Sequence, residues 1–339
     1  MKKYIALWIT GILLLSNLAA CSSAGNGASS GTSGDEDTIS IVTTIFPEYD
    51  WVKEVLGDQA GNTEVTMLLD NGVDLHSYQP TVMDIAKIAT CDLFIYVGGE
   101  SDKWAEDALA ESTNPDMKVI NLMEVLGDTV KEEEIVEGME AEDEDDHGDE
   151  SGKQEDDEEE IEYDEHVWLS LRNAETIVRA IADAIVELDE ENASVYQANA
   201  EGYIKQLQAL DAEYQEAVNN GTKNTILFGD RFPFRYLTDD YHINYYAAFV
   251  GCSAETEASF ETVVFLADKI DELNLHTVLT IEGTDHRIAE TIIENTKSKD
   301  QVVLSLNSMQ GTTSEDVEEG ATYLSIMEEN LEVLKEALK

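Results

Sequence analysis

The stretch YDEHVWLS, residues 163–170, lies where a long acidic run ends and an amphipathic, helix-forming half of the chain begins. His166 in this stretch is one of six histidines, with carboxylates before it and an apolar patch directly after it. Packing at the edge of an apolar segment holds an imidazole in one orientation, as a metal ligand requires. The same pattern is more common for an ordinary, partly buried histidine, so the stretch needs support from elsewhere in the chain.

On both sides of this stretch, short β-rich segments alternate with amphipathic segments of helical length. Strand-like segments occupy residues 38–44, 64–69, 93–98 and 118–122 before it, and 225–228, 243–249, 277–282 and 302–306 after it. Apolar residues at helical spacing mark 49–56, 82–88 and 103–109 before it, and 174–188, 193–218, 260–273, 287–296 and 321–338 after it. Strands separated by helix-sized segments predict βαβ units around parallel sheets.

This alternation predicts an α/β fold with two Rossmann-like lobes, each built on a parallel sheet. We place the first lobe at residues 38–190, a linking helix at 191–220 and the second lobe at 221–339. The uninterrupted helical pattern at 193–218 would give a helix roughly 40 Å long. Two lobes joined by one long helix, with a cleft between the lobes, is the simplest arrangement of these elements.

The first 37 residues have the composition of a targeting segment. Two lysines precede an apolar run within residues 1–20, which predicts a secretory signal. The run ends in Leu-Ala-Ala-Cys, which resembles a bacterial lipobox in which Cys21 becomes the lipidated first residue. Residues 21–37 are rich in Gly, Ser and Asp and predict a flexible tether. We therefore expect a protein anchored by lipid on Cys21 to the extracytoplasmic face of the cell membrane.

Two cysteines remain after Cys21, namely Cys91 in an apolar strand-like segment and Cys252 after a glycine. Two cysteines are too few for a disulfide framework. A single bridge and a pair of buried thiols are both compatible with this pattern.

The chain is strongly acidic, with a formal net charge of −53 at pH 7. Residues 131–165 hold 21 acidic residues against two lysines. Such a run cannot bury enough apolar surface to offset the entropy of ordering it, so we expect it to be disordered. The rest of the chain is also acidic and would repel nucleic acid, which excludes nucleic acid as a partner.

Candidate metal ligands follow the predicted strands. His76 follows the second strand, and His166 ends the acidic run in the same lobe. In the second lobe, Asp230 follows one strand while Glu282 and His286 follow another. Because parallel sheets carry ligand residues at the carboxyl ends of their strands, a cleft between the lobes would gather these side chains. Imidazoles with carboxylates are typical of a zinc site, with manganese or iron as alternatives.

The chain resembles the cluster A-I metal-binding lipoproteins of ABC importers, close to the zinc-uptake binding proteins. The segments that carry the resemblance are 45–47, 72–80, 93–99, 164–169, 230–237, 254–259 and 308–310. The resemblance implies two α/β lobes joined by one rigid helix, with a single metal ion in the cleft. It implies that His76 and His166 are the first and second histidine ligands. It also implies a monomer that binds zinc, or alternatively manganese or iron, and delivers the metal to an ABC permease.

The second lobe departs from the family pattern. Zinc-binding members usually have a histidine directly before the aspartate at the third ligand position, and here Gly229 precedes Asp230. We expect His286 to supply the late ligand, with Asp230 or Glu282 completing or orienting the site. Two other classes stay open: a metallohydrolase with Glu282 as its base, and an adhesin-like surface lipoprotein. Of these classes we favour a binding protein without enzymatic activity.

Overall fold

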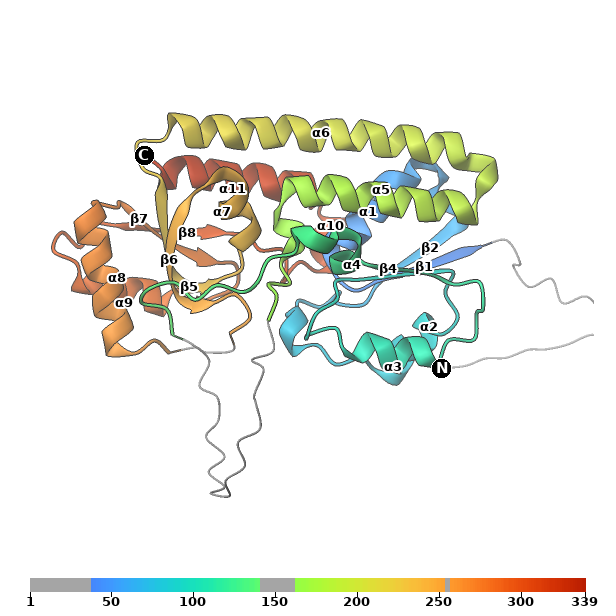
Figure 1. Cartoon of the computed structure of the whole chain (residues 1–339), viewed down its shortest axis with the longest axis horizontal. Coiled ribbons are helices and arrows are strands. Elements are labelled where there is room, and N and C mark those ends of the chain that lie inside the picture. The colour runs from blue at the N-terminus through green and yellow to red at the C-terminus, as the bar shows by residue number, and fades with distance from the viewer. Residues whose placement is uncertain (1–37, 141–161, 254–256) are drawn as a thin grey trace, which may run out of the picture. The chain divides into compact units, whose positions relative to one another are not determined.

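Two four-stranded parallel sheets lie at the centre of the described chain (Figure 1). The computed structural model describes residues 38–140, 162–253 and 257–339. The predicted signal, the tether and Cys21 lie outside the described residues, as does the middle of the acidic run. Every helix in the described part is too short or too polar to cross a membrane.

The first sheet has the strand order β2-β1-β3-β4, with each neighbouring pair parallel. Its strands are β1 (Ile39–Thr43), β2 (Thr63–Met67), β3 (Leu93–Tyr96) and β4 (Lys118–Asn121). The helices of this lobe are α1 (Phe46–Leu56), α2 (Val82–Ile88), α3 (Trp104–Ala110) and α4 (Leu122–Leu126). All four residues of β3 are buried, which fits the interior position of this strand in a parallel sheet. The order reverses between β1 and β3, the point at which such sheets bind ligands.

The second sheet repeats this order as β6-β5-β7-β8, again with parallel neighbours. Its strands are β5 (Thr225–Phe232), β6 (Asn244–Val250), β7 (Thr277–Ile281) and β8 (Val302–Leu306). The helices are α7 (Arg235–Tyr241), α8 (Phe260–Leu273), α9 (Arg287–Asn295), α10 (Ser314–Glu318) and α11 (Tyr323–Ala337). A register shift between Phe228 and Arg231 carries β5 four residues past its predicted end. Gly229 and Asp230 therefore belong to the strand and not to a loop after it.

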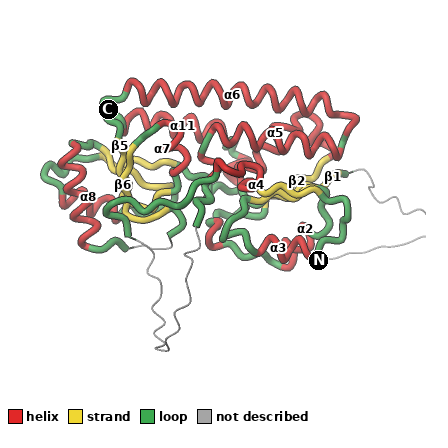
Figure 2. The backbone as a smooth tube through the Cα atoms, in the orientation of Figure 1, coloured by secondary structure: helices red, strands yellow, loops and turns green. Residues whose placement is uncertain are grey.

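Two long helices follow the stretch that ends at Ser170. The Ser170 side chain accepts a hydrogen bond from the Asn173 amide and so caps α5 (Leu171–Leu188). The next helix, α6 (Ala193–Asn220), is the predicted linking helix and ends two residues beyond the predicted pattern. Figure 2 shows α6 running past the strands of both sheets. The α/β class, the two lobes and the long helix between them are confirmed.

Buried contacts hold the two lobes together beside this helix. The amide of Tyr323, at the start of α11, donates to Asp50 on α1 at 3.0 Å, and its ring packs edge-on to Trp51. The Tyr323 hydroxyl donates to the carbonyl of Trp168 at 2.7 Å. The Trp168 indole in turn donates to the carbonyl of Ser308 at 2.8 Å. One apolar core contains residues of both lobes, so the lobes share packing and are not independent.

The described ends of the acidic run are held in place, which differs from the expected disorder of residues 131–165. In the strap (residues 131–140), the Glu140 amide donates to the carbonyl of Ala248 at 3.0 Å, beside the edge strand β6. The amide of Asp164 donates to the carbonyl of Lys131 at 2.9 Å. Backbone pairing and side-chain contacts, such as the ion pair of Glu134 with Arg235, hold these acidic residues in place. Residues 141–161 lie outside the described part.

Burial raises the pKa of Asp50 to about 7, although the Tyr323 amide lowers it. In the unfolded chain, the carboxyl of Asp50 ionises near its ordinary pKa. The stability that protonated Asp50 gives the folded state is therefore complete below that pKa and is lost as the pH rises towards 7. We expect Asp50→Asn to abolish this contribution, so that wild type loses roughly 2–3 kcal/mol more than the variant between pH 5 and pH 8. Urea unfolding at both pH values measures the difference. Equal losses in the two proteins would contradict this assignment.

Candidate metal centre

The loop after β2 places His76. Asp74 accepts a hydrogen bond from the His76 amide at 3.0 Å and so begins a short 3₁₀ turn, Leu75–Ser77. Leu75 is fully buried and anchors this turn in the core. The Nδ1 atom of His76 lies 2.7 Å from the hydroxyl of Ser101. The ring is thereby fixed by one nitrogen, and its Nε2 atom faces the cleft.

The stretch at residues 163–170 places His166 opposite His76. Asp164 accepts hydrogen bonds through one oxygen from the His166 amide at 2.9 Å and from its Nδ1 at 3.1 Å. The ring is fully buried and lies against the ring of Trp168, with 5.2 Å between the centroids. A carboxylate that accepts from Nδ1 leaves the Nε2 lone pair available, which is the arrangement found behind metal-bound histidines.

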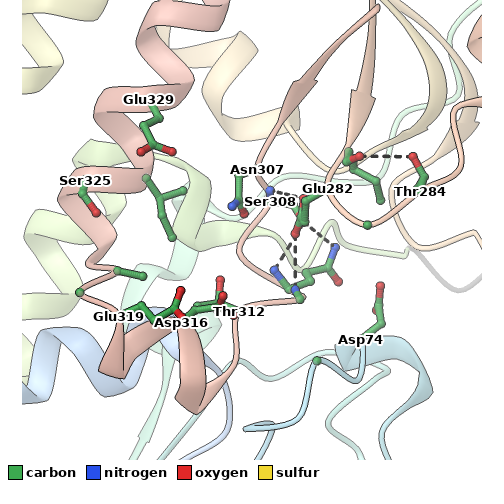
Figure 3. A pocket seen from close by; sticks show the side chains of 18 of the residues that line it. Asp74, Glu282, Thr284, Asn307, Ser308, Thr312, Asp316, Glu319, Ser325 and Glu329 are labelled. Carbon is green, nitrogen blue, oxygen red and sulfur yellow. Dashed lines mark hydrogen bonds between the residues drawn. The ribbon is translucent and has the colours of Figure 1, made fainter.

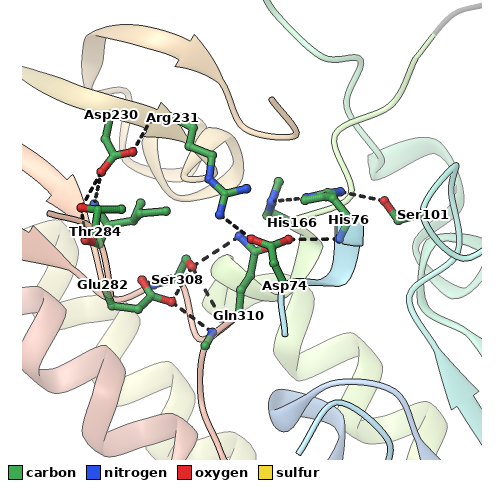
Figure 4. Close-up of polar contacts among 12 residues, drawn as sticks. Asp74, His76, Ser101, His166, Asp230, Arg231, Glu282, Thr284, Ser308 and Gln310 are labelled. Atoms are coloured by element: carbon green, nitrogen blue, oxygen red, sulfur yellow. Dashed lines mark hydrogen bonds and ion pairs between the residues drawn. The ribbon is translucent and has the colours of Figure 1, made fainter. Parts of the chain in front are cut away.

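The two imidazoles face each other through their Nε2 atoms, which are 3.2 Å apart (Figure 4). Glu165 lies 3.4 Å from Nδ1 of His76, so both rings have an acceptor on the far nitrogen. Two lone pairs at this separation repel unless a proton or a cation lies between them. Metal–nitrogen bonds of about 2.0–2.1 Å in a tetrahedral site place two nitrogens roughly 3.3–3.4 Å apart. The observed separation therefore fits two ligands of one tetrahedral ion.

Glu165 adds negative charge beside the pair. Its side chain accepts a hydrogen bond from the Ser101 amide at 2.9 Å and is almost fully buried. Burial alone would raise the pKa of Glu165, but hydrogen bonds from His76 and Ser101 hold it below its ordinary value. The site thus has a buried carboxylate that stabilises a cation bound at the imidazoles.

Cys252 is the third donor and was not predicted as a ligand. The ligand atoms of His76, His166 and Cys252 all lie within 4.8 Å of one another. Cys252 follows β6, at the same sheet edge that made Asp230 a candidate. The rule that ligand residues follow the carboxyl ends of parallel strands (the strand-end rule) could therefore have selected it. Burial and the nearby carboxylates, Asp164 first among them, raise the pKa of the Cys252 thiol, while the Glu165 amide opposes this.

Gly251 allows this approach of the two lobes. A Cβ atom at Gly251 would lie 2.9 Å from the carbonyl oxygen of Phe232 and 3.0 Å from Cε1 of His166. Any side chain at this position would push the second lobe away from the His166 ring. The residue before Cys252 therefore has to be glycine for the thiol to reach the histidine pair.

The predicted carboxylate ligands are engaged within the second lobe. Asp230 accepts hydrogen bonds from its neighbour Arg231, from the Ile281 amide at 3.3 Å and from the Thr284 hydroxyl at 2.9 Å. Glu282 accepts from the amide and the hydroxyl of Ser308, both at 2.7 Å (Figure 4). Both side chains organise the loop after β7. Within the described residues, the structure does not bring either of them into the group of close donors.

His286 lies at the start of α9 with a left-handed backbone, φ 58°. Its Nδ1 atom is buried and has no hydrogen-bond partner among the described residues. It lines a cavity of about 380 Å³ that Asp74, Ser77 and Asp230 also border. The structure does not place His286 in the group formed by His76, His166 and Cys252, as far as the chain is described. Metal binding by His286, Asp230 or Glu282 therefore stays a prediction from sequence and would require the loops of the second lobe to move.

The glycine at position 229, where the resemblance led us to expect a histidine, is required by packing. A Cβ atom at Gly229 would lie 2.6 Å from Cα and 2.9 Å from the amide nitrogen of Ala289 in α9. Because these are backbone atoms of a packed helix, they cannot give way cheaply. Close packing of α9 on β5 thus leaves no room for a third histidine at this position.

An ion pair joins the lobes beside the histidines. Arg231 on β5 pairs with Asp74, whose other oxygen caps the turn that holds His76. Burial raises the pKa of Asp74, but Arg231 and His76 together, through charge and hydrogen bonds, outweigh it and keep the pKa below its ordinary value. Both residues also border a polar cavity of about 810 Å³ (Figure 3). Arg231 therefore holds the His76 loop against the second lobe.

Comparisons with known proteins identify the family of the chain. Residues 41–337 match the family model described as "Zinc-uptake complex component A periplasmic", ZnuA. The chain belongs to the ZnuA family. It is 30% identical over 298 residues to the zinc-binding lipoprotein AdcA of Streptococcus pneumoniae, covering 88% of this chain and 55% of AdcA. The chain thus spans about half the length of that relative.

Relatives of similar length also exist. The chain is 28% identical over 337 residues to the high-affinity zinc uptake system protein ZnuA of Bacillus subtilis, covering 99% of this chain and 98% of that protein. The crystal structure of the Zn(II)-bound ZnuA-like domain of AdcA has 25% identity and a TM-score of 0.67, covering 89% of this chain and 99% of the domain. The laminin-binding protein Lmb of Streptococcus agalactiae, described as having adhesin and metal transporting activity, has 25% identity and a TM-score of 0.68, with 89% and 100% coverage.

We expect Gly229→Ala to lower the free energy of unfolding by about 1–3 kcal/mol, because its Cβ must displace α9. Gly202 is the matched control, since it lies in the middle of α6 and a Cβ there would meet open space. Gly202→Ala should raise the stability by roughly 0.5–1 kcal/mol through the higher helix propensity of alanine. Urea unfolding compares the two. If Gly229→Ala were as stable as wild type, α9 would not be packed on β5 in this way.

Proposed function

We propose that this protein is an extracytoplasmic zinc-binding lipoprotein that delivers the metal to an ABC permease. The observation that carries the proposal is the pair of imidazoles, His76 and His166, facing each other at 3.2 Å with acceptors behind both rings. Membership of the ZnuA family supports zinc as the cargo. The site lies where the two lobes meet, as expected for a protein that encloses a small ligand.

The donor atoms favour zinc over manganese. Imidazole nitrogen suits zinc, whereas manganese prefers carboxylate and carbonyl oxygen. The two carboxylates nearest the pair, Asp164 and Glu165, face the Nδ1 atoms of the rings, on the side away from the Nε2 atoms. They therefore orient the ligands and balance the charge of the ion. Manganese or iron remains the alternative cargo, and we expect either to bind more weakly.

The lipid anchor, the permease and the monomeric state are parts of the same proposal. The lipobox-like ending at Cys21 supports attachment to the membrane, which would keep the protein beside its permease. An adhesin role is the second candidate, favoured by the similarity to Lmb. Elemental analysis of protein purified without chelator tests zinc as the cargo, and binding to immobilised laminin tests the adhesin role, because Lmb is described as having both activities.

We infer a carrier and not an enzyme. Hydrolysis at a metal would need a general base beside the ion, and Glu282 was the candidate for that role. Glu282 instead accepts hydrogen bonds from Ser308, and a weaker one from the Gly311 amide at 3.4 Å. Its carboxylate thus holds the loop at residues 308–311.

We expect His76→Ala and His166→Ala each to abolish tight zinc binding while the fold stays intact. Zinc at 1,000 times Kd should stabilise the wild type by roughly 4 kcal/mol, because it binds the folded state only. Each variant should lose most of this stabilisation in thermal melts with and without zinc. His276→Ala is the control, because His276 is exposed and lies outside the site. An unchanged zinc-induced shift in either site variant would remove that residue from the site.

A further expectation concerns the acidic segment 141–161. The proposed ligands lie outside this segment, so replacing it with a short neutral linker should leave the tight affinity for zinc within a few-fold. Its carboxylates raise the local cation concentration and should speed metal association at low salt. Stopped-flow and calorimetric titrations of the two proteins measure rate and affinity. Loss of tight binding would mean that this segment supplies ligands.

A further inference from the structure

We propose that Cys252 is the metal ligand supplied by the second lobe, so that His76, His166 and Cys252 form a mixed nitrogen and sulfur site. This inference rests on the proposed function, because it names the third ligand of the same ion. It differs from the sequence prediction, in which His286 completed the site with Asp230 or Glu282.

The distances between the donor atoms favour Cys252. In a tetrahedral zinc site with Zn–N of about 2.0–2.1 Å and Zn–S of about 2.3 Å, nitrogen and sulfur lie roughly 3.5–3.6 Å apart. The three ligand atoms already lie within 4.8 Å of one another. The sulfur thus needs to approach each nitrogen by roughly 1.3 Å at most. The competing carboxylates of Asp230 and Glu282, by contrast, would first have to give up their hydrogen bonds.

The backbone on both sides of the cleft holds the thiol at this position. Gly251 lies directly against the His166 ring, so the backbone of the next residue is brought to the site. The sulfur also lies within 4.8 Å of the ligand nitrogens of His76 and His166, in the first lobe. The thiol therefore sits between two lobes at a position that the close approach of Gly251 creates. Packing alone does not require this, since Cys252 is partly exposed.

The nearby carboxylates raise the pKa of the free thiol, so Cys252 would bind as a thiolate only when the positive charge of the ion is present. Zinc binding at this set replaces the proton of the thiol: the S–H bond breaks, a sulfur–zinc bond forms and the proton leaves to solvent. The thiolate and the buried carboxylates of Asp164 and Glu165 then surround the divalent ion with compensating negative charge. A thiolate also strengthens selection against manganese, because soft sulfur ligands prefer zinc.

Cobalt(II) substitution tests the proposal on the full chain. A cobalt–thiolate bond gives an intense near-ultraviolet charge-transfer band that nitrogen and oxygen ligands do not give. We expect this band in the wild type and its loss in Cys252→Ser. Cys91→Ser is the matched control, because Cys91 is fully buried in the first lobe and its sulfur lies near Met117. Loss of a residue that only hydrogen-bonds to a metal ligand lowers metal affinity roughly 10–100-fold. The affinity of Cys252→Ser for zinc should fall by more than this.

A second measurement does not depend on the folding of Cys252→Ser. Zinc should protect Cys252 of the wild type from alkylation, as mapped by mass spectrometry, and His166→Ala should lose this protection. Cobalt that binds tightly without the charge-transfer band, or a Cys252 that zinc leaves reactive, would overturn the ligand assignment while the proposed function stands. A wild type that binds neither zinc nor cobalt tightly would overturn both.

Discussion

The hydrogen bond from the Trp168 indole to the carbonyl of Ser308 ties the metal site to the interface between the lobes. Trp168 is fully buried, and its own carbonyl accepts from Tyr323. A buried donor left without its partner would cost about 1–3 kcal/mol, so the lobes resist separation here. His166 lies two residues before Trp168 and packs on its ring. The position of His166 and the relative position of the lobes are therefore fixed by the same contacts.

This constraint means that the protein itself orients the ligands. The imidazoles are held by Asp164, Ser101 and Glu165 and do not depend on an ion for their positions. The Arg231–Asp74 pair holds the His76 loop across the cleft. Preorganised ligands need little reordering on binding, which favours high affinity. Release of a bound metal ion would then require movement of the His76 loop, because the His76 ring is partly exposed whereas the His166 ring is fully buried.

Much of the fold could be predicted from sequence because apolar periodicity fixes element type and because βαβ units impose parallel pairing. The strand-end rule likewise assigns His76 and His166 to one site from the sequence alone. It cannot show where a side chain points at that edge. Near Gly229 the register of β5 shifts, and the Asp230 side chain points towards Thr284 within the second lobe. A register shift of one residue moves the side chains of a strand to the opposite face of the sheet. Cys252 lies at the same edge, but in the sequence it was weighed only as half of a disulfide or as a buried thiol.

The proposed function depends most on one zinc ion bound between His76 and His166 with ligands from both lobes. X-ray absorption at the zinc edge, on protein loaded with one equivalent of zinc, tests it most directly. We predict imidazole scattering from two nitrogens at about 2.0–2.1 Å and one sulfur at about 2.3 Å. A first shell of oxygen atoms without imidazole scattering would contradict this site.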